Sequence, residues 1–156
     1  MSSFIIEKQK TVCVTGHRNL KNDLDREKLK SVLLNLCVEG YKTFLVGMAV
    51  GFDTLCFNLL EEIKREKEIK IIACIPCIDQ AKKFSFLQKK EYERMLSVAD
   101  EKIIISQEYT PWCMQKRNEF MVDNSSVLVS YLRENKGGTA NTVNYAKKKN
   151  IRIIEV

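Results

Sequence analysis

A turn with two adjacent glycines stands directly in front of a segment of helical periodicity, over residues 136–149 (KGGTANTVNYAKKK). Gly137 and Gly138 let the backbone turn tightly. Three polar side chains that can donate hydrogen bonds follow, namely Thr139, Asn141 and Thr142. The first N–H groups of a helix lack intrahelical acceptors and carry partial positive charge, so this combination predicts a site for an anion such as phosphate. The alternative is a simple helix entry capped by Thr139, for which one glycine would be enough.

A second glycine-containing segment covers residues 47–53 (GMAVGFD). The small residues Gly47, Ala49 and Gly51 would allow a ligand to come close to the backbone at the start of a helix. Asp53 has two interpretations, because it could cap that helix or accept a hydrogen bond from a ribose hydroxyl. The spacing is not the G-x-G-x-x-G pattern of dinucleotide-binding folds, so a hydride-transfer cofactor is not predicted.

The segment 15–18 (TGHR) contains the only histidine of the chain. Gly16 permits a tight turn, and His17 and Arg18 offer hydrogen-bond donors to a phosphate or a carbonyl group. The alternative is a plain turn with two solvated side chains, because a single histidine is a weak indication of a site.

The segment 109–118 (YTPWCMQKRN) combines aromatic residues with a cation. Tyr109 and Trp112 could stack on a base, and Arg117 could bind a phosphate group. Trp112 at a helix start is equally compatible with packing in the core.

The cysteines raise the question of metal or redox chemistry. Residues 74–77 (CIPC) have the C-x-x-C spacing, but the following residues resemble a loop, whereas a redox motif should open a helix. A zinc site would need two further ligands, for which only Cys113 and His17 are candidates. Most of the six cysteines stand in apolar stretches, where a reduced thiol behaves as a small hydrophobic group. We therefore predict no metal site, and reduced thiols in a cytoplasmic protein.

Short β-branched runs alternate with segments of helical period along the whole chain. The runs predict strands at 11–15, 43–46, 70–75, 102–106, 126–131 and 151–154. The segments between them predict helices at about 24–39, 52–66, 84–98, 112–123 and 139–149. This alternation predicts a single-domain, Rossmann-like α/β fold, with a mostly parallel sheet and helices on both faces. In such sheets ligands bind at the carboxyl ends of the strands, where the segments described above fall.

Length and composition limit the classes of protein. The chain has 156 residues, with 45% hydrophobic and 29% charged residues, which is typical of one soluble globular domain. No apolar run approaches the ~20 residues that span a bilayer, and the N-terminal residues lack the pattern of a signal peptide, so export and membrane insertion are not expected. The net charge of +6 fits an anionic partner, and equally fits lysines on solvated helix faces.

Four motifs, in their order and spacing, resemble those of the SLOG superfamily of Rossmann-like nucleotide-binding domains, and most closely its YpsA/YoqJ-like branch in bacteria and their phages. They are VTGHR, GMAVGFD, MQKRNEFMVDNSSVLVSY and GGTANTVNYAKKK. The resemblance runs from about Lys10 to Val156, which implies an N-terminal extension over residues 1–9 and one SLOG-like domain over residues 10–156.

The resemblance also implies roles for individual residues. Gly47, Ala49, Gly51 and Asp53 match the G-x-A-x-G-x-D loop of members similar to the DNA-processing protein DprA. The lonely-guy enzymes, which hydrolyse nucleoside monophosphates, use an arginine whose position corresponds to Arg117 and a glutamate whose position corresponds to an asparagine here, Asn144. A neutral amide stabilises an oxocarbenium-like transition state less than a carboxylate does. The resemblance thus implies a retained pocket and puts the usual catalysis in question.

We predict a binding module for a nucleotide or an ADP-ribose-like molecule, which senses or sequesters a signal nucleotide. The predicted ligand-binding residues are Gly16, His17, Arg18, Gly47, Met48, Ala49, Gly51, Asp53, Pro76, Arg117, Asn118, Asp123, Asn124, Gly137, Gly138, Thr139, Asn141 and Thr142. The alternative is a nucleotide phosphoribohydrolase or nucleosidase, with His17, Arg117 and Glu119 as candidate catalytic residues. Binding of single-stranded DNA ranks third, so nucleic acid is not the expected partner, because only Lys147, Lys148 and Lys149 form a tight basic cluster. A homodimer is compatible with the apolar helix faces.

Overall fold

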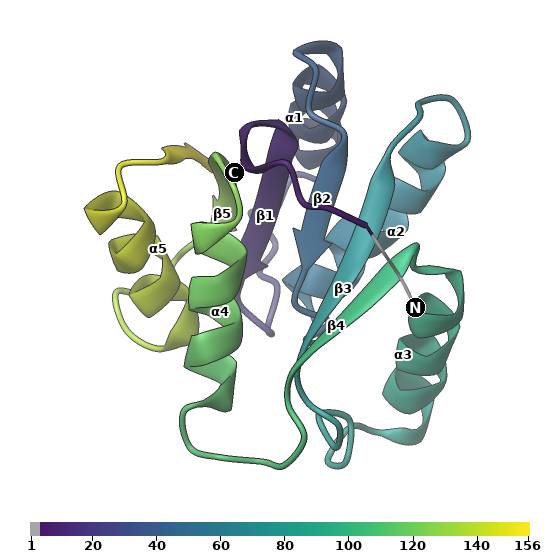
Figure 1. Ribbon diagram of the computed structural model, residues 1–156, viewed down its shortest axis with the longest axis vertical. Helices are drawn as coiled ribbons and strands as arrows, with labels where there is room; N and C mark the ends of the chain where they lie inside the picture. The colour runs from purple at the N-terminus through teal and green to yellow at the C-terminus, as the bar shows by residue number, and fades with distance from the viewer. Residues whose placement is uncertain (1–3) are drawn as a thin grey trace.

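A six-stranded, fully parallel sheet forms the centre of the computed structural model, which describes residues 4–156 (Figure 1). The strands are β1 (Thr11–Gly16), β2 (Thr43–Val46), β3 (Lys70–Cys77), β4 (Glu101–Ser106), β5 (Val127–Tyr131) and β6 (Arg152–Glu155). Their order across the sheet is β4-β3-β2-β1-β5-β6. The sequence-based prediction of a single Rossmann-like α/β domain is confirmed, and every strand pair is parallel.

Helices cover both faces of the sheet (Figure 1). They are the short 3-10 helix η1 (Lys8–Lys10) and the α-helices α1 (Arg26–Val38), α2 (Phe52–Lys64), α3 (Phe86–Val98), α4 (Cys113–Asp123) and α5 (Gly138–Lys148). Helices α1, α2 and α3 contribute Leu33, Leu60 and Met95 to one core cluster, and α4 and α5 contribute Met121 and Val143 to the other. The central strands are buried on both faces, which explains their nearly continuous apolar runs.

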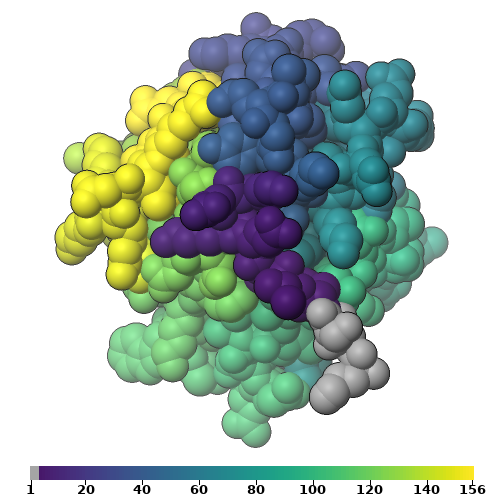
Figure 2. Space-filling model, turned by 45° about the horizontal axis from the view of Figure 1, so that its top comes forward, coloured from purple at the N-terminus to yellow at the C-terminus, as the bar shows by residue number. Residues whose placement is uncertain are grey.

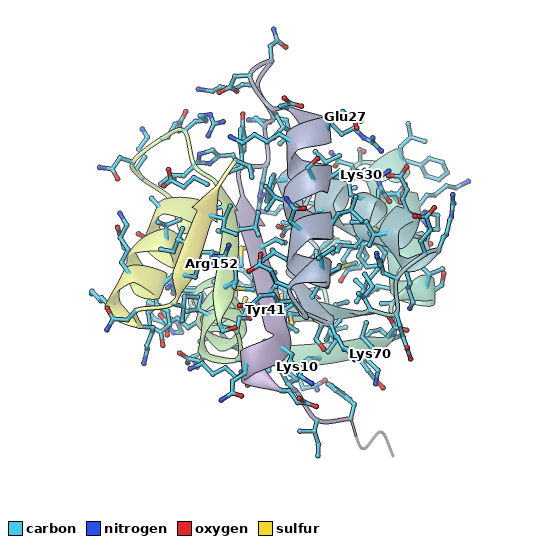
Figure 3. All side chains as sticks on the ribbon, turned by 90° about the horizontal axis from the view of Figure 1, so that it is seen from above. Lys10, Glu27, Lys30, Tyr41, Lys70 and Arg152 are labelled. Carbon is cyan, nitrogen blue, oxygen red and sulfur yellow. The ribbon has the colours of Figure 1, made fainter. Side chains whose placement is uncertain are left out.

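The chain changes direction across the sheet at β1. Strands β1 to β4 follow one another toward one edge, and β5 then returns to pair with the other side of β1, with Thr15 opposite Ser130. In parallel sheets such a switch point leaves a crevice between loops that leave the carboxyl ends of neighbouring strands in opposite directions. In Figure 3, Glu27 at the start of α1 lies toward this carboxyl edge, and Lys10 before β1 lies toward the opposite edge.

The C-x-x-C segment differs from its sequence-based prediction, because β3 continues two residues farther and includes both cysteines. Residues three apart on a strand point to opposite faces, so Cys74 and Cys77 do not form a joint site. Burial raises the pKa of the Cys74 thiol to about 12, which keeps it protonated. All six cysteines are free, and residues 4–156 contain no group of three or more His, Cys, Asp or Glu side chains suited to a metal ion.

The predicted N-terminal extension falls partly on residues 1–3, which lie outside the described part of the chain. Phe4 and Ile6 pack against the core cluster to which α4 and α5 contribute. Figure 2 shows these N-terminal residues in purple, lying against the surface of the domain. Within residues 4–156, no helix combines the length and the apolar character that crossing a membrane requires.

Gly51 and Gly138 offer a matched pair of substitutions to alanine. Gly51 has φ +84°, and a Cβ there would overlap the carbonyl oxygen of Arg18, whereas a Cβ on Gly138 would meet nothing within 4 Å. We expect Gly51→Ala to lower the free energy of unfolding by about 2–3 kcal/mol through overpacking and backbone strain. Gly138→Ala should stay within about 0.5 kcal/mol of wild type. Urea denaturation measures both, and equal stabilities of the two variants would contradict this packing of the loop.

Candidate functional site

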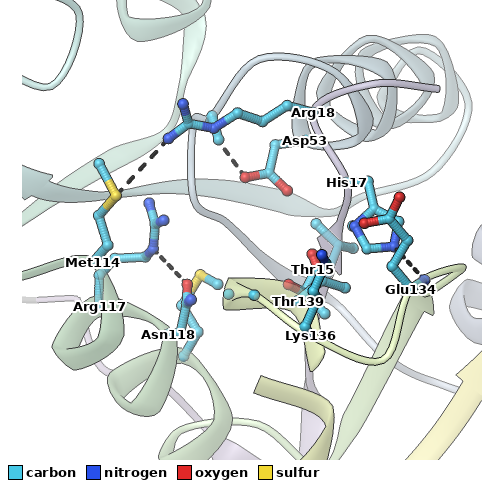
Figure 4. Close-up of a pocket in the computed structure, with 16 residues that line it drawn as sticks. Thr15, His17, Arg18, Asp53, Met114, Arg117, Asn118, Glu134, Lys136 and Thr139 are labelled. Carbon is cyan, nitrogen blue, oxygen red and sulfur yellow. Dashed lines mark hydrogen bonds between the residues drawn. The ribbon is translucent and has the colours of Figure 1, made fainter. Parts of the chain in front are cut away.

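A cavity of about 540 Å³ opens at the carboxyl edge of the sheet, at the switch point beside β1. Its walls come from the end of β1, the β2–α2 loop, one side of α4 and the turn before α5. Figure 4 shows Arg18, Asp53 and Arg117 on one side of the cavity, and Glu134, Lys136 and Thr139 on the other. The volume lies within the range of pockets that hold small ligands, ~300–1,000 Å³.

The structure brings ten of the predicted site residues together around this cavity. They are Gly16, His17, Arg18, Ala49, Asp53, Arg117, Asn118, Gly137, Gly138 and Thr139. They come from four segments that are far apart in the sequence, and the parallel topology places the four beside one another.

Some predicted residues of the β2–α2 loop lie beside the cavity rather than on its wall. Gly47 is covered by the Arg117 guanidinium, since a Cβ on Gly47 would come within 2.8 Å of Nη1. Met48, with φ +66°, and Gly51 line a second cavity of about 350 Å³ on the α2–α3 side. The loop is therefore a wall between two cavities, and of its predicted small residues only Ala49 faces the first.

The remaining predicted residues outside the cavity lining are Pro76, Glu119, Asp123, Asn124, Asn141 and Thr142. Asp123 and Asn124 lie at the C-terminal end of α4, which leads to the opposite edge of the sheet, and Asp123 accepts a hydrogen bond from Tyr145 Oη at 2.8 Å. Thr142 Oγ1 donates to the Gly138 carbonyl at 2.8 Å, so its hydroxyl is engaged within α5. Glu119 accepts from Gln115 Nε2 at 2.9 Å on α4.

Arg117 is a buried cation held by backbone carbonyl groups. Its side chain is only 5% exposed. Nη1 donates to the carbonyls of Gly47 and of Cys74, and Nε donates to Asn118 Oδ1 at 2.7 Å. Among the described residues no carboxylate lies within ion-pair distance of Arg117, so its charge is available to a bound anion. Burial lowers the pKa of the guanidinium, and the nearby Asp53 carboxylate opposes this shift.

Asp53 is a buried carboxyl group on the wall of the cavity. It is the second residue of α2, and its Oδ2 accepts a hydrogen bond from Ala49 N at 3.1 Å, so it closes the loop before the helix instead of occupying the N-cap position. Burial raises its pKa from 3.8 to about 6, against the opposing effects of Arg117, the Ala49 N–H group and Arg18. A carboxyl group in this environment can accept a hydroxyl proton of a ligand or exchange protons near neutral pH.

The turn before α5 presents an uncapped helix N-terminus to the cavity. Gly137 is the N-cap residue with φ +91°, and no side chain caps the helix. Thr139 is the second residue of the helix, so it is not the cap that the simple alternative required. Gly137, Gly138 and Thr139 all line the cavity together with Lys136. Unpaired N–H groups and a lysine at a helix N-terminus form an arrangement that binds anions.

His17 joins the first loop to the turn before α5. Its Nε2 accepts hydrogen bonds from the backbone N–H groups of Arg133 at 2.8 Å and Glu134 at 3.3 Å, and its ring packs edge-on against Tyr131. In this arrangement His17 holds the first loop against the turn before α5.

Six lining residues were not predicted from the sequence. They are Val14, Thr15, Met114, Met121, Glu134 and Lys136. Helical periodicity could have identified the two methionines, because Met114 and Met121 share a face of α4 with Arg117 and Asn118. Glu134 and Lys136 lie within three residues of the double glycine, and their proximity to that turn was the available signal.

The comparisons with known proteins agree with this fold. The model of the YspA SLOG family matches residues 8–154. The SPbeta prophage-derived protein YoqJ of Bacillus subtilis is 37% identical over 139 residues, which covers 79% of this chain and 80% of YoqJ. Two solved structures of DNA processing protein A (DprA) have the same fold, each with a TM-score of 0.66. The protein from Streptococcus pneumoniae is 16% identical, with 95% of this chain covered, and that from Helicobacter pylori is 18% identical, with 93% covered. This chain spans 50% and 64% of their respective lengths.

Proposed function

Because this chain belongs to the YspA SLOG family, we propose that its cavity binds a nucleotide or an ADP-ribose-like molecule, and that the protein senses or sequesters this ligand. One observation carries the proposal. The uncapped N-terminus of α5 faces the same cavity as a buried carboxyl group and a buried arginine that has no ion-pair partner within residues 4–156.

The three groups correspond to the three parts of such a ligand. A phosphate would lie against the first N–H groups of α5 and Lys136, because both favour negative charge. Asp53 would accept a hydrogen bond from a ribose hydroxyl. Arg117 and Arg18 would balance the remaining negative charge, with Arg117 contributing more because it is buried and Arg18 is exposed.

The DprA likeness bears on our expectation that nucleic acid is not a partner. The Helicobacter pylori DprA has a single-stranded DNA binding mode. The shared fold weakens our expectation, so an oligonucleotide belongs in the same binding test. Binding of single-stranded DNA through the phosphate backbone should fall steeply with salt, by about 0.7 in log affinity per log salt for each phosphate contacted.

Calorimetric titration of the full chain with AMP, ADP-ribose, adenosine and a short oligodeoxythymidine tests the proposal, after mass spectrometry of any small molecule that copurifies. We expect AMP or ADP-ribose to bind more tightly than adenosine, because adenosine lacks the phosphate for α5. Binding of the oligonucleotide alone would support the third hypothesis. Absence of binding to all four would count heavily against a nucleotide site.

Hydrolysis of the ligand is a second candidate function, favoured by the pKa of Asp53 near 6 in a cavity beside two arginines. A carboxylate there could stabilise the oxocarbenium-like state of N-glycosidic cleavage or take a proton from the attacking water. Asn144, at the position of the lonely-guy glutamate, is exposed and lies outside the cavity lining. Chromatography of AMP incubated with wild type and with Asp53→Asn decides the matter. A free base that accumulates only with wild type means an enzyme, and intact AMP in both means a binding protein.

A further inference from the structure

A hydrogen-bond chain reaches Arg117 from the far side of the β2–α2 loop. The carbonyl oxygen of Gly47 accepts two hydrogen bonds. One comes from Nη1 of Arg117, and the other comes from Nε2 of Gln80, in the turn after β3, at 3.0 Å. A carbonyl oxygen has two lone pairs, so both donors can be satisfied at once. Gln80 lies outside the first cavity, and nothing in the proposed ligand contacts requires it.

The carbonyl oxygen of Gly47 fixes which way the Gln80 amide faces, because a carbonyl oxygen can only accept a hydrogen bond and therefore requires Nε2. The hydroxyl of Tyr92 on α3, which can donate or accept, then donates to Gln80 Oε1 at 3.0 Å and holds the amide in place. Each group from Tyr92 to Gly47 therefore donates to the next one, and hydrogen bonds in such a chain strengthen one another.

The backbone at Gly47 needs an external restraint. The next residue, Met48, is a non-glycine residue at φ +66° and is fully buried. Strained backbone of this kind persists only where surrounding contacts determine it. Gly47 also packs directly against the Arg117 guanidinium, with no space for a Cβ. A displacement of the backbone at Gly47 would therefore shift the position of the guanidinium.

We propose that Gln80, held in place by Tyr92, is a positioning residue for Arg117 and acts through the carbonyl group of Gly47. The chain of contacts holds the guanidinium at the cavity wall without touching the ligand. The part of this proposal that concerns ligand affinity rests on the proposed function; the part that concerns the position of Arg117 does not.

Asp53 reports the position of Arg117 without any ligand. The groups that act on its carboxyl group are the guanidinium of Arg117, the Ala49 N–H group and the guanidinium of Arg18. Withdrawal of a nearby positive charge raises the pKa of a carboxyl group. Loss of the Gln80 contact should therefore move the pKa of Asp53 upward. A general loosening of the fold would admit water and move it downward, because burial is the main cause of the raised pKa.

The experiment measures the pKa of Asp53 by carbon NMR of the aspartate carboxyl groups, with Asp53→Asn assigning the signal. We expect Gln80→Met to raise this pKa by about 1, and Tyr92→Phe to raise it by less, since Gln80 keeps its bond to Gly47. Gln88→Met is the matched control, because the side chain of Gln88 hydrogen-bonds to the backbone of Ser85 at the cap of α3 and is not bonded to Gln80 or Gly47. It should leave the pKa unchanged. In calorimetry, Gln80→Met should weaken AMP binding about tenfold.

The outcomes separate the two proposals. An unchanged pKa of Asp53 in Gln80→Met overturns the positioning role, and so does an equal rise in Gln88→Met. A lower melting temperature in Gln80→Met with an unchanged pKa also overturns it, since Gln80 would then only stabilise the fold. Absence of binding of both AMP and ADP-ribose to wild type, together with the expected rise in pKa, rejects the proposed function and leaves the positioning role intact.

Discussion

Replacing Arg117 with methionine is expected to lower the free energy of unfolding by about 3 kcal/mol and to weaken nucleotide binding by about 100-fold or more. Methionine fills similar space but leaves the carbonyls of Gly47 and Cys74 and the amide oxygen of Asn118 without their donor. It also removes the positive charge that offsets the cost of burying the Asp53 carboxylate. Chemical denaturation and calorimetry with AMP measure the two effects.

Arg18→Met is the matched control for this prediction. Arg18 is exposed, and within residues 4–156 its side chain makes one hydrogen bond, from Nη2 to the sulfur of Met114 at 3.9 Å. Its loss should change the free energy of unfolding by less than about 0.5 kcal/mol, as for other surface positions. The double variant Arg117→Met, Asp53→Asn should recover part of the stability, because no buried carboxylate then lacks its cation. Strict additivity of the two substitutions would contradict an interaction between Asp53 and Arg117.

Replacing Asp53 with asparagine is expected to stabilise the protein above pH 6 and to weaken nucleotide binding. The folded-state pKa of Asp53 is raised from 3.8 to about 6, so the folded protein holds this proton more tightly than the unfolded chain does. The stability that this proton contributes is complete below the pKa of the unfolded state. It is lost as the pH rises through the pKa of the folded state. This pKa shift corresponds to a loss of about 3 kcal/mol in the stability of wild type between low and high pH. The Asp53→Asn variant has no carboxyl group at this position, so it does not undergo this loss.

Urea denaturation of wild type and Asp53→Asn at about pH 4 and about pH 8 checks this difference. The variant should gain on wild type by about 2 kcal/mol between the two conditions, because the lower pH already lies just above the unfolded pKa. AMP binding at the higher pH should fall about tenfold, because an amide oxygen is a weaker acceptor than a carboxylate. A pH-independent difference in stability would mean that the carboxyl group titrates normally. A group that costs stability and improves binding is characteristic of a functional site.

Much of the fold could be predicted from local patterns in the sequence. The β-branched run 43–46 coincides with β2, and the predicted helix 112–123 begins one residue before α4. Strand β3 was predicted too short, because Pro76 and Cys77 have no strand character of their own, and the strand extends to them through the pairing of Cys77 with Ser106 of β4. The positions of Asp123 and Asn124 could have been inferred as well, since a helix that follows a strand ends at the amino edge of a parallel sheet.

The cavity lining depended on contacts that no local pattern contains. In the segment 47–53 the small residues look equivalent, yet Arg117, seventy residues away, covers Gly47 and leaves Ala49 to face the cavity. The role of His17 likewise depends on the backbone of Arg133 and Glu134.

The sequence by itself determined the alternation of strands and helices, and with it the edge of the sheet at which the glycine-containing loops meet. Strand period, helix period and chain polarity are local properties, so one chain segment suffices to read each of them. Only the tertiary structure decided which loop residues face the cavity, that Asp53 is buried with a raised pKa, and that Arg117 rests on Gly47. Burial and electrostatic environment are set by side chains from distant segments, so they exist only once the sheet has brought those segments together.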